Sequence, residues 1–180
     1  TCVAGNHHLP QVVDNTLRLF DYVGAATPVA AGADLALVEA RHEPLELHGR
    51  DGMAELGLPP TIRTVEPEHA VEFMRHVLMG TDEPVSLICL APLTNLALLL
   101  RMYPDVTTHI ADVTVMGGTL AVHGNTSPLA EFNIRTDPEA AAVVFESGLP
   151  VRLYPLDVFR AIQFTRVEAG RFAAGESRSA

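Results

Sequence analysis

Apolar positions along the chain alternate between helical and extended spacing. The helical spacing predicts a first helix that ends at Gly24, because glycine commonly terminates helices. Its inward face would consist of Val12, Val13, Thr16, Leu17, Phe20 and Val23. Residues 28–31 form a short extended piece. Residues 34–65 contain many turn formers and little periodicity, which predicts mostly loop.

The rest of the chain repeats a helix–strand pattern. Helices are predicted over 67–79, over 93–102 and from Asp137 to Gly148, each bounded by residues suited to start or stop a helix. Short continuous apolar runs predict strands over 86–90, 113–116 and 151–156. The inward positions are Ala70, Phe73, Met74 and Val77 in the first of these helices, and Ala140, Ala141, Val144 and Phe145 in the last.

This order of elements predicts the fold class. Helices alternating with continuously apolar strands imply an α/β protein with a mostly parallel, Rossmann-like sheet and helices on both faces. Ligands in such sheets bind beyond the carboxyl ends of the strands. Leu90, Gly117 and Asp157 lie at or just beyond three predicted strand ends, so they are expected at the same edge of the sheet.

Composition excludes several classes of function. The 180 residues carry 12 basic and 22 acidic side chains, a formal net charge of −10, and every basic residue is arginine. The negative charge argues against a nucleic-acid partner, and the absence of lysine excludes Schiff-base catalysis by a lysine. Cys2 and Cys89 are too few for a disulfide framework or a zinc site, and Cys89 in its apolar run is expected to be buried. No apolar stretch is long enough to span a bilayer, and these features together predict a cytoplasmic protein without a membrane partner.

The segment 117–136 is the main candidate for chemistry. It is a long polar segment after a strand and carries Asn125, Glu131 and Asn133. Amides and carboxylates complement the hydroxyl groups of a sugar, so these side chains could bind a polyhydroxyl compound. His48 stands beside Gly49, and glycine allows the backbone to approach a ligand closely. The nucleophile-elbow, dinucleotide-binding and zinc-protease motifs are absent from the sequence.

Several motifs, in order, resemble landmarks of the inosine–uridine-preferring nucleoside hydrolases. They are Val3-Ala4-Gly5-Asn6, His48-Gly49, Ala91-Pro92-Leu93-Thr94-Asn95, Val115-Met116-Gly117-Gly118, Gly124-Asn125, Ala130-Glu131-Phe132-Asn133 and Asp137-Pro138-Glu139-Ala140-Ala141. The resemblance implies a fold of about twice this length and hydrolysis of the N-glycosidic bond of ribonucleosides, with water bound to Ca²⁺ as the nucleophile.

The resemblance also implies roles for individual residues. The substrate-binding positions would be Asn6, His48, Met116, Asn125, Glu131 and Asn133, with His48 on the side of the base and the others around the ribose. The backbone carbonyl of Leu90 would be a calcium ligand. Asn6, Asn125, Glu131 and Asn133 are therefore expected to converge on one pocket. The calcium-binding Asp cluster with the general base, and the leaving-group His, would lie outside this chain, so no catalytic residue is assigned within it.

Residues 1–180 are accordingly expected to be the central part of a nucleoside hydrolase domain, with 166–180 poorly ordered or a truncated helix. Two alternatives stay open: a non-catalytic ribosyl-binding homologue of the same fold, and an α/β interaction module without a small-molecule site. The family resemblance also implies a homo-oligomer, either a dimer or a tetramer. The sequence leaves the preference for purine or pyrimidine nucleosides undecided.

Overall fold

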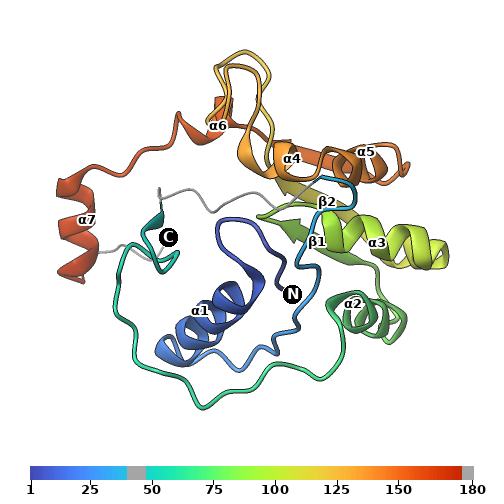
Figure 1. Ribbon diagram of the computed structural model, residues 1–180, viewed down its shortest axis with the longest axis horizontal. Helices are drawn as coiled ribbons and strands as arrows, with labels where there is room; N and C mark the ends of the chain where they lie inside the picture. The colour runs from blue at the N-terminus through green and yellow to red at the C-terminus, as the bar shows by residue number, and fades with distance from the viewer. Residues whose placement is uncertain (40–47, 176–180) are drawn as a thin grey trace.

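The computed structural model describes residues 1–39 and 48–175. Helices and strands alternate over most of the chain (Figure 1). In order, the elements are α1 (Leu9–Tyr22), α2 (Ala70–Met79), β1 (Val85–Cys89), α3 (Thr94–Met102), η2 (Pro104–His109), β2 (Ile110–Met116), α4 (Phe132–Thr136), α5 (Pro138–Phe145), β3 (Val151–Tyr154), α6 (Leu156–Phe159) and α7 (Arg166–Ala173).

The three strands form one parallel sheet in the order β1-β2-β3. Cys89 pairs with Val115, and Met116 pairs with Tyr154, so the carboxyl ends of all three strands lie at one edge. Past the last strand pair, Leu156 N–H donates to the Gly118 carbonyl at 3.0 Å. The mostly parallel α/β class and the shared edge predicted for Leu90, Gly117 and Asp157 are thereby confirmed.

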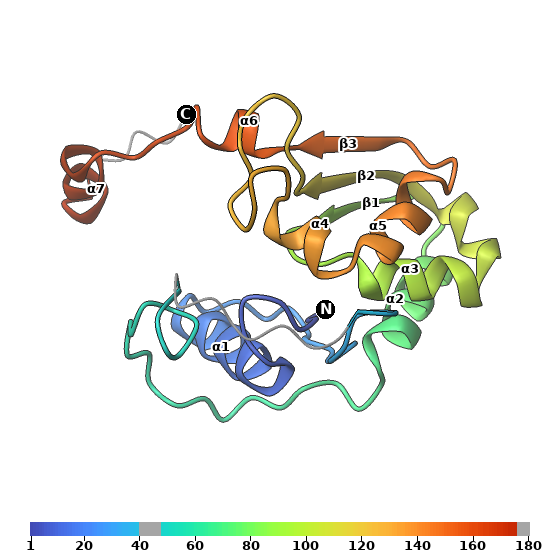
Figure 2. The same cartoon turned by 45° about the horizontal axis from the view of Figure 1, so that its top comes forward.

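The main core lies between one face of the sheet and the helices α2, α3 and α5 (Figure 2). Val113 and Val115 of β2 are fully buried there against Leu99 of α3 and Val144 of α5. The opposite face of the strands is more polar and more open, and Ile88 on it is 71% exposed. Helices were expected on both faces of the sheet. Within the described residues, the helices of the main core cover only one of these faces.

A smaller unit is built from the first 33 residues. Cys2 pairs in parallel with Ala31, and a second cluster forms where α1 packs Leu17 against Cys2 and Val29. Asn95 of α3 joins this unit to the rest of the protein, because its side chain donates to the Cys2 carbonyl and accepts from Ala33 N–H, both at 2.8 Å. A β-carbon on Gly32 would lie within 2.6 Å of the Asn95 amide, so this contact requires glycine.

The structure corrects several predicted bounds and faces. Helix α2 starts at Ala70 rather than at 67, β2 is three residues longer than predicted, and α4 lies inside a segment predicted as loop. Three residues predicted to face inward are exposed instead: Val23 at 61%, Val77 at 48% and Phe145 at 44%. For α2 the reason is its packing against α3, which buries Val71 and Leu78 rather than Val77.

Candidate functional site at the carboxyl edge of the sheet

Asn133 connects two strand ends. Its side-chain amide donates to the Met116 carbonyl at 3.1 Å and lies 3.4 Å from the Leu90 carbonyl oxygen. Asn133 itself is buried at the start of α4. Leu90, Met116 and Asn133, which the sequence analysis assigned one by one, are thus in direct contact. They meet at the edge of the sheet where parallel α/β proteins bind ligands.

Glu131 fixes the position of α4 at this edge. The residue is 2% exposed, and its carboxylate accepts hydrogen bonds from Gly118 N–H at 2.9 Å and from Ile134 N–H at 3.1 Å. The second bond caps the helix, and the first ties the helix to the end of β2. Gly117 and Gly118 permit this approach: a β-carbon on Gly117 would lie 3.2 Å from the carboxylate, and Gly118 has a φ of +73°.

Asn125 shapes the loop before α4. Its side-chain oxygen accepts from Phe132 N–H at 2.8 Å, and its own N–H donates to the Ala130 carbonyl at 3.1 Å. Gly124 is packed so tightly that a β-carbon there would lie 2.1 Å from the Ala130 carbonyl oxygen. In this structure Asn125 therefore closes a compact turn that presents Glu131 and α4.

Helix α6 holds the other end of the same loop. The Asp157 carboxylate accepts from Leu120 N–H at 2.9 Å and from Ala121 N–H at 2.8 Å, and these two bonds lower the pKa of Asp157. Arg160 donates to the Gly124 carbonyl at 3.3 Å. In the sequence analysis Asp157 only marked a strand end. Its position as an acidic residue in the first turn of a helix that follows a strand could have indicated that it binds backbone N–H groups.

Asn6 and His48 lie toward the smaller unit. Both side chains are exposed. Gly5 lies against the turn after β1, where a β-carbon on it would be 3.0 Å from Pro92 Cδ. His7 Nε2 forms a hydrogen bond of 3.1 Å with the Arg50 carbonyl, which brings the segment of His48 beside that of Asn6. These contacts join residues more than 40 positions apart in sequence.

Asp137 is a further buried carboxylate that sequence reasoning treated only as a helix cap. It is fully buried and accepts from Thr94 Oγ1 at 2.6 Å, Leu37 N–H at 3.0 Å and Ala140 N–H at 3.0 Å. These bonds tie the loop before residue 40 to α3 and α5. Asp137 is therefore a structural support for the edge, held away from solvent.

A cavity of about 540 Å³ lies beside Glu131. Its lining includes Gly118, Thr119, Leu129 and Arg135. Of the predicted substrate residues, only Glu131 is among the residues that line this cavity in the described chain. Asn125, Glu131 and Asn133 lie together around the start of α4, whereas Asn6 lies toward the smaller unit, so the expected convergence of all four on one pocket stays a prediction.

The described residues do not by themselves provide a calcium site. No group of three or more His, Cys, Asp or Glu side chains within them could hold a metal ion. Ca²⁺ takes about six to eight oxygen ligands, and the Leu90 carbonyl is one. Burial raises the pKa of the partly buried Cys89 thiol to about 11, which disfavours the thiolate form that metal binding and nucleophilic attack require.

The fold and the edge define an α/β protein with a parallel sheet and amide and carboxylate side chains at its strand ends. The sequence profile of the inosine-uridine preferring nucleoside hydrolases matches residues 1–179. The chain belongs to this family, and the resemblance drawn from the motifs is confirmed.

The chain is 42% identical over 158 residues to the non-specific ribonucleoside hydrolase RihC of Escherichia fergusonii, covering 88% of this chain and 52% of that protein. It is 39% identical over 175 residues to the pyrimidine-specific ribonucleoside hydrolase RihA of an Enterobacter species, covering 97% and 56%. A solved purine-preferring ribonucleoside hydrolase from Gardnerella vaginalis superposes with a TM-score of 0.90 at 30% identity, covering 98% of this chain and 57% of that one. The chain thus spans about half the length of these relatives. No helix among the described residues is long and apolar enough to cross a membrane.

Proposed function

We propose that these residues are part of a ribonucleoside hydrolase domain that cleaves the N-glycosidic bond of nucleosides to free base and ribose. The contact of Asn133 with both Leu90 and Met116 carries this proposal. It brings together residues that the family resemblance assigns to the ribose and to the metal, at the edge of the sheet where such folds bind ligands. Membership of the family and the names of the relatives support the same reaction class.

The chain's own residues would act mainly by binding and orienting the ribose. Cleavage of an N-glycosidic bond passes through an oxocarbenium-like ribosyl cation. Polar contacts from Asn6, Asn125, Glu131 and Asn133 to the sugar hydroxyls would fix the anomeric carbon in place. Met116 would lie against the sugar, and His48 would stand on the side of the base.

Calcium is part of the proposal for the complete protein. The Leu90 carbonyl would supply one ligand, with the remaining oxygen ligands coming from outside residues 1–180. A bound Ca²⁺ would activate water and hold the ribose diol. We further propose a cytoplasmic homo-oligomer. The relatives are named as non-specific, pyrimidine-specific and purine-preferring, so the base preference is left to experiment.

The direct test is release of free ribose from inosine and from uridine, measured for the 180-residue chain and for a protein that also carries the half present in the relatives. The longer protein should release ribose and lose that activity with a calcium chelator, whereas the 180-residue chain should be inactive. Binding of ribose without turnover by the longer protein would favour the non-catalytic homologue. Failure to bind either ribose or Ca²⁺ in calorimetry would favour the interaction module.

A further inference from the structure

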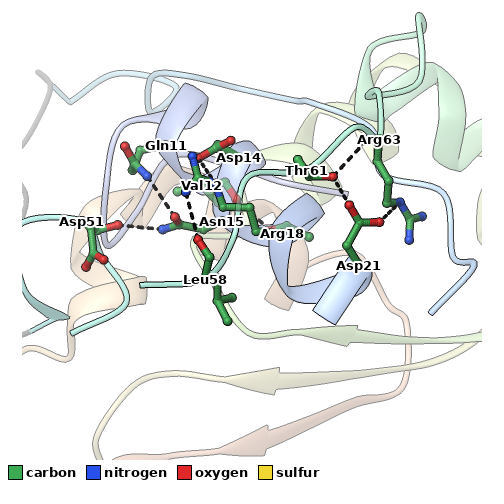
Figure 3. A network of polar contacts seen from close by, with 11 residues as sticks. Gln11, Val12, Asp14, Asn15, Arg18, Asp21, Asp51, Leu58, Thr61 and Arg63 are labelled. Carbon is green, nitrogen blue, oxygen red and sulfur yellow. Dashed lines mark hydrogen bonds and ion pairs between the residues drawn. The ribbon is translucent and has the colours of Figure 1, made fainter. Parts of the chain in front are cut away.

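Residues 49–55, which follow His48, contain no helix or strand, and side chains from outside this turn hold it in place. Helix α1 supplies the contacts (Figure 3). Asn15 Nδ2 donates to the Asp51 carbonyl at 2.7 Å, and His7, just before the helix, bonds the Arg50 carbonyl at 3.1 Å. Two consecutive carbonyls of the turn are therefore fixed by two side chains from one neighbouring segment.

The orientation of Asn15 is itself fixed. Gln11, one helical turn earlier, donates to the Asn15 side-chain oxygen at 2.9 Å, which leaves the Asn15 amide nitrogen directed at Asp51 (Figure 3). Arg18 repeats this arrangement one turn later: Asp14 holds its Nε at 2.7 Å, and its guanidinium donates to the Leu58 carbonyl at 3.3 Å. One polar face of α1 thus donates hydrogen bonds to backbone carbonyls of residues 50–58.

His48 is hydrogen-bonded into the same turn. Ala54 N–H donates to the His48 carbonyl at 2.7 Å. The Asp51 carboxylate accepts from Met53 N–H at 2.8 Å and from Glu55 N–H at 3.0 Å. A β-carbon on Gly52 would lie 3.4 Å from Asn15 Nδ2, so the turn is in close contact with the helix at the point where Asn15 binds it. A displacement at Asp51 would therefore be transmitted to His48.

We propose that Asn15 is a positioning residue that sets the place of His48 and thereby tunes which nucleobases the enzyme accepts. This inference rests on the proposed function, in which His48 stands on the base side. Of the proposed ribose contacts, those of Glu131 and Asn133 are held by Gly118 and Met116, and these hydrogen bonds do not involve α1. Loss of the Asn15 contact should therefore affect different nucleosides unequally instead of lowering all rates alike.

The experiment compares kcat/KM for inosine and uridine in the complete protein and in three variants, well below their melting temperatures. In Asn15→Ala the inosine-to-uridine ratio should change about threefold to tenfold, mostly through KM, as expected for the loss of one hydrogen bond. Gln11→Ala keeps the Asn15 donor but frees its orientation, so the ratio should shift in the same direction by less.

Arg63→Met is the matched control. Arg63 joins the other end of α1 to the following segment through Asp21 and the carbonyls of Ala25 and Thr27 (Figure 3 shows Arg63 beside Asp21). This variant should lower the melting temperature and leave the inosine-to-uridine ratio unchanged. A ratio that stays at the wild-type value in Asn15→Ala, or that shifts equally in Arg63→Met, overturns the inference while the proposed function stands.

Amide hydrogen exchange tests the placement separately. Ala54 N–H should exchange faster in Asn15→Ala than in Arg63→Met, because only the first variant releases the turn. Equal exchange in both would also overturn the inference. If the wild-type protein releases no ribose from either nucleoside, the proposed function fails and the specificity role of Asn15 fails with it.

Discussion

The side-chain amide of Asn133 lies 3.4 Å from the carbonyl oxygen of Leu90, which precedes it by 43 residues. The same amide donates to Met116. The start of α4 is thereby joined to the ends of β1 and β2 by one side chain. This contact brings the carbonyl of Leu90, the proposed metal ligand, together with Met116 and Asn133, two of the proposed ribose-binding residues.

Asn133→Ala in the complete protein should lower kcat/KM for inosine and uridine alike. Loss of a polar contact to the substrate corresponds to about 1–3 kcal/mol, or about fivefold to 150-fold. The measurement is ribose release at subsaturating substrate, with the exposed Glu146→Gln as the control for general effects. Activity within twofold of wild type would show that Asn133 serves only the fold.

Glu131→Ala should lower stability as well as activity. The carboxylate is buried and satisfies two backbone N–H groups, so its removal would cost about 1–3 kcal/mol of unfolding free energy. Glu131→Gln keeps an acceptor oxygen and should cost less. Urea unfolding of the two variants beside wild type gives the comparison, and equal loss in both would contradict the capping role.

Asp157→Ala should release the loop that contains residues 119–124. The amides of Leu120 and Ala121 lose their acceptor and should exchange about tenfold faster or more. Hydrogen exchange measures this directly, and Asp105→Asn, an exposed acidic residue of η2, is the control.

The hydrogen bonds from Leu120 and Ala121 to the Asp157 carboxylate should be insensitive to pH near neutrality. Hydrogen bonds from Leu120 and Ala121 lower the pKa of Asp157 from its ordinary value of 3.8. A lowered carboxyl pKa means that the stabilisation is present above the unfolded value and is lost as pH falls through the folded value. After correction for intrinsic exchange rates, protection of the two amides should be constant between about pH 5 and 8 and decrease only below the ordinary pKa. A decrease near pH 6 would point to another group.

Cys89 should resist alkylation in the native protein. Burial raises its pKa to about 11, so at pH 8 only about one thiol in a thousand is ionised. Labelling with iodoacetamide followed by peptide mass spectrometry should show slow modification of Cys89, and fast modification after unfolding in urea. Equal native and unfolded rates would mean that the strand opens readily.

The sequence by itself determined the alternation of helices and strands, the parallel α/β class and the family. These follow from local features: continuous apolar runs for the strands, Asp137-Pro138 at the start of α5, and ordered motifs between Val3 and Ala141. Local features are readable from sequence because chain geometry fixes which residues share a helix turn or a strand face.

Only the tertiary structure decided which side chains face inward and which polar groups meet. Val77 and Phe145 fit an apolar stripe, but the neighbouring elements bury a different side of each helix. Glu131 was assigned to a sugar, whereas in the fold its carboxylate also holds Gly118 and caps α4. The anchoring of the His48 turn by Asn15 had no local signal at all. A hydrogen bond forms only within about 3 Å, and that proximity between distant segments is created by packing of the whole chain rather than by the residues on either side.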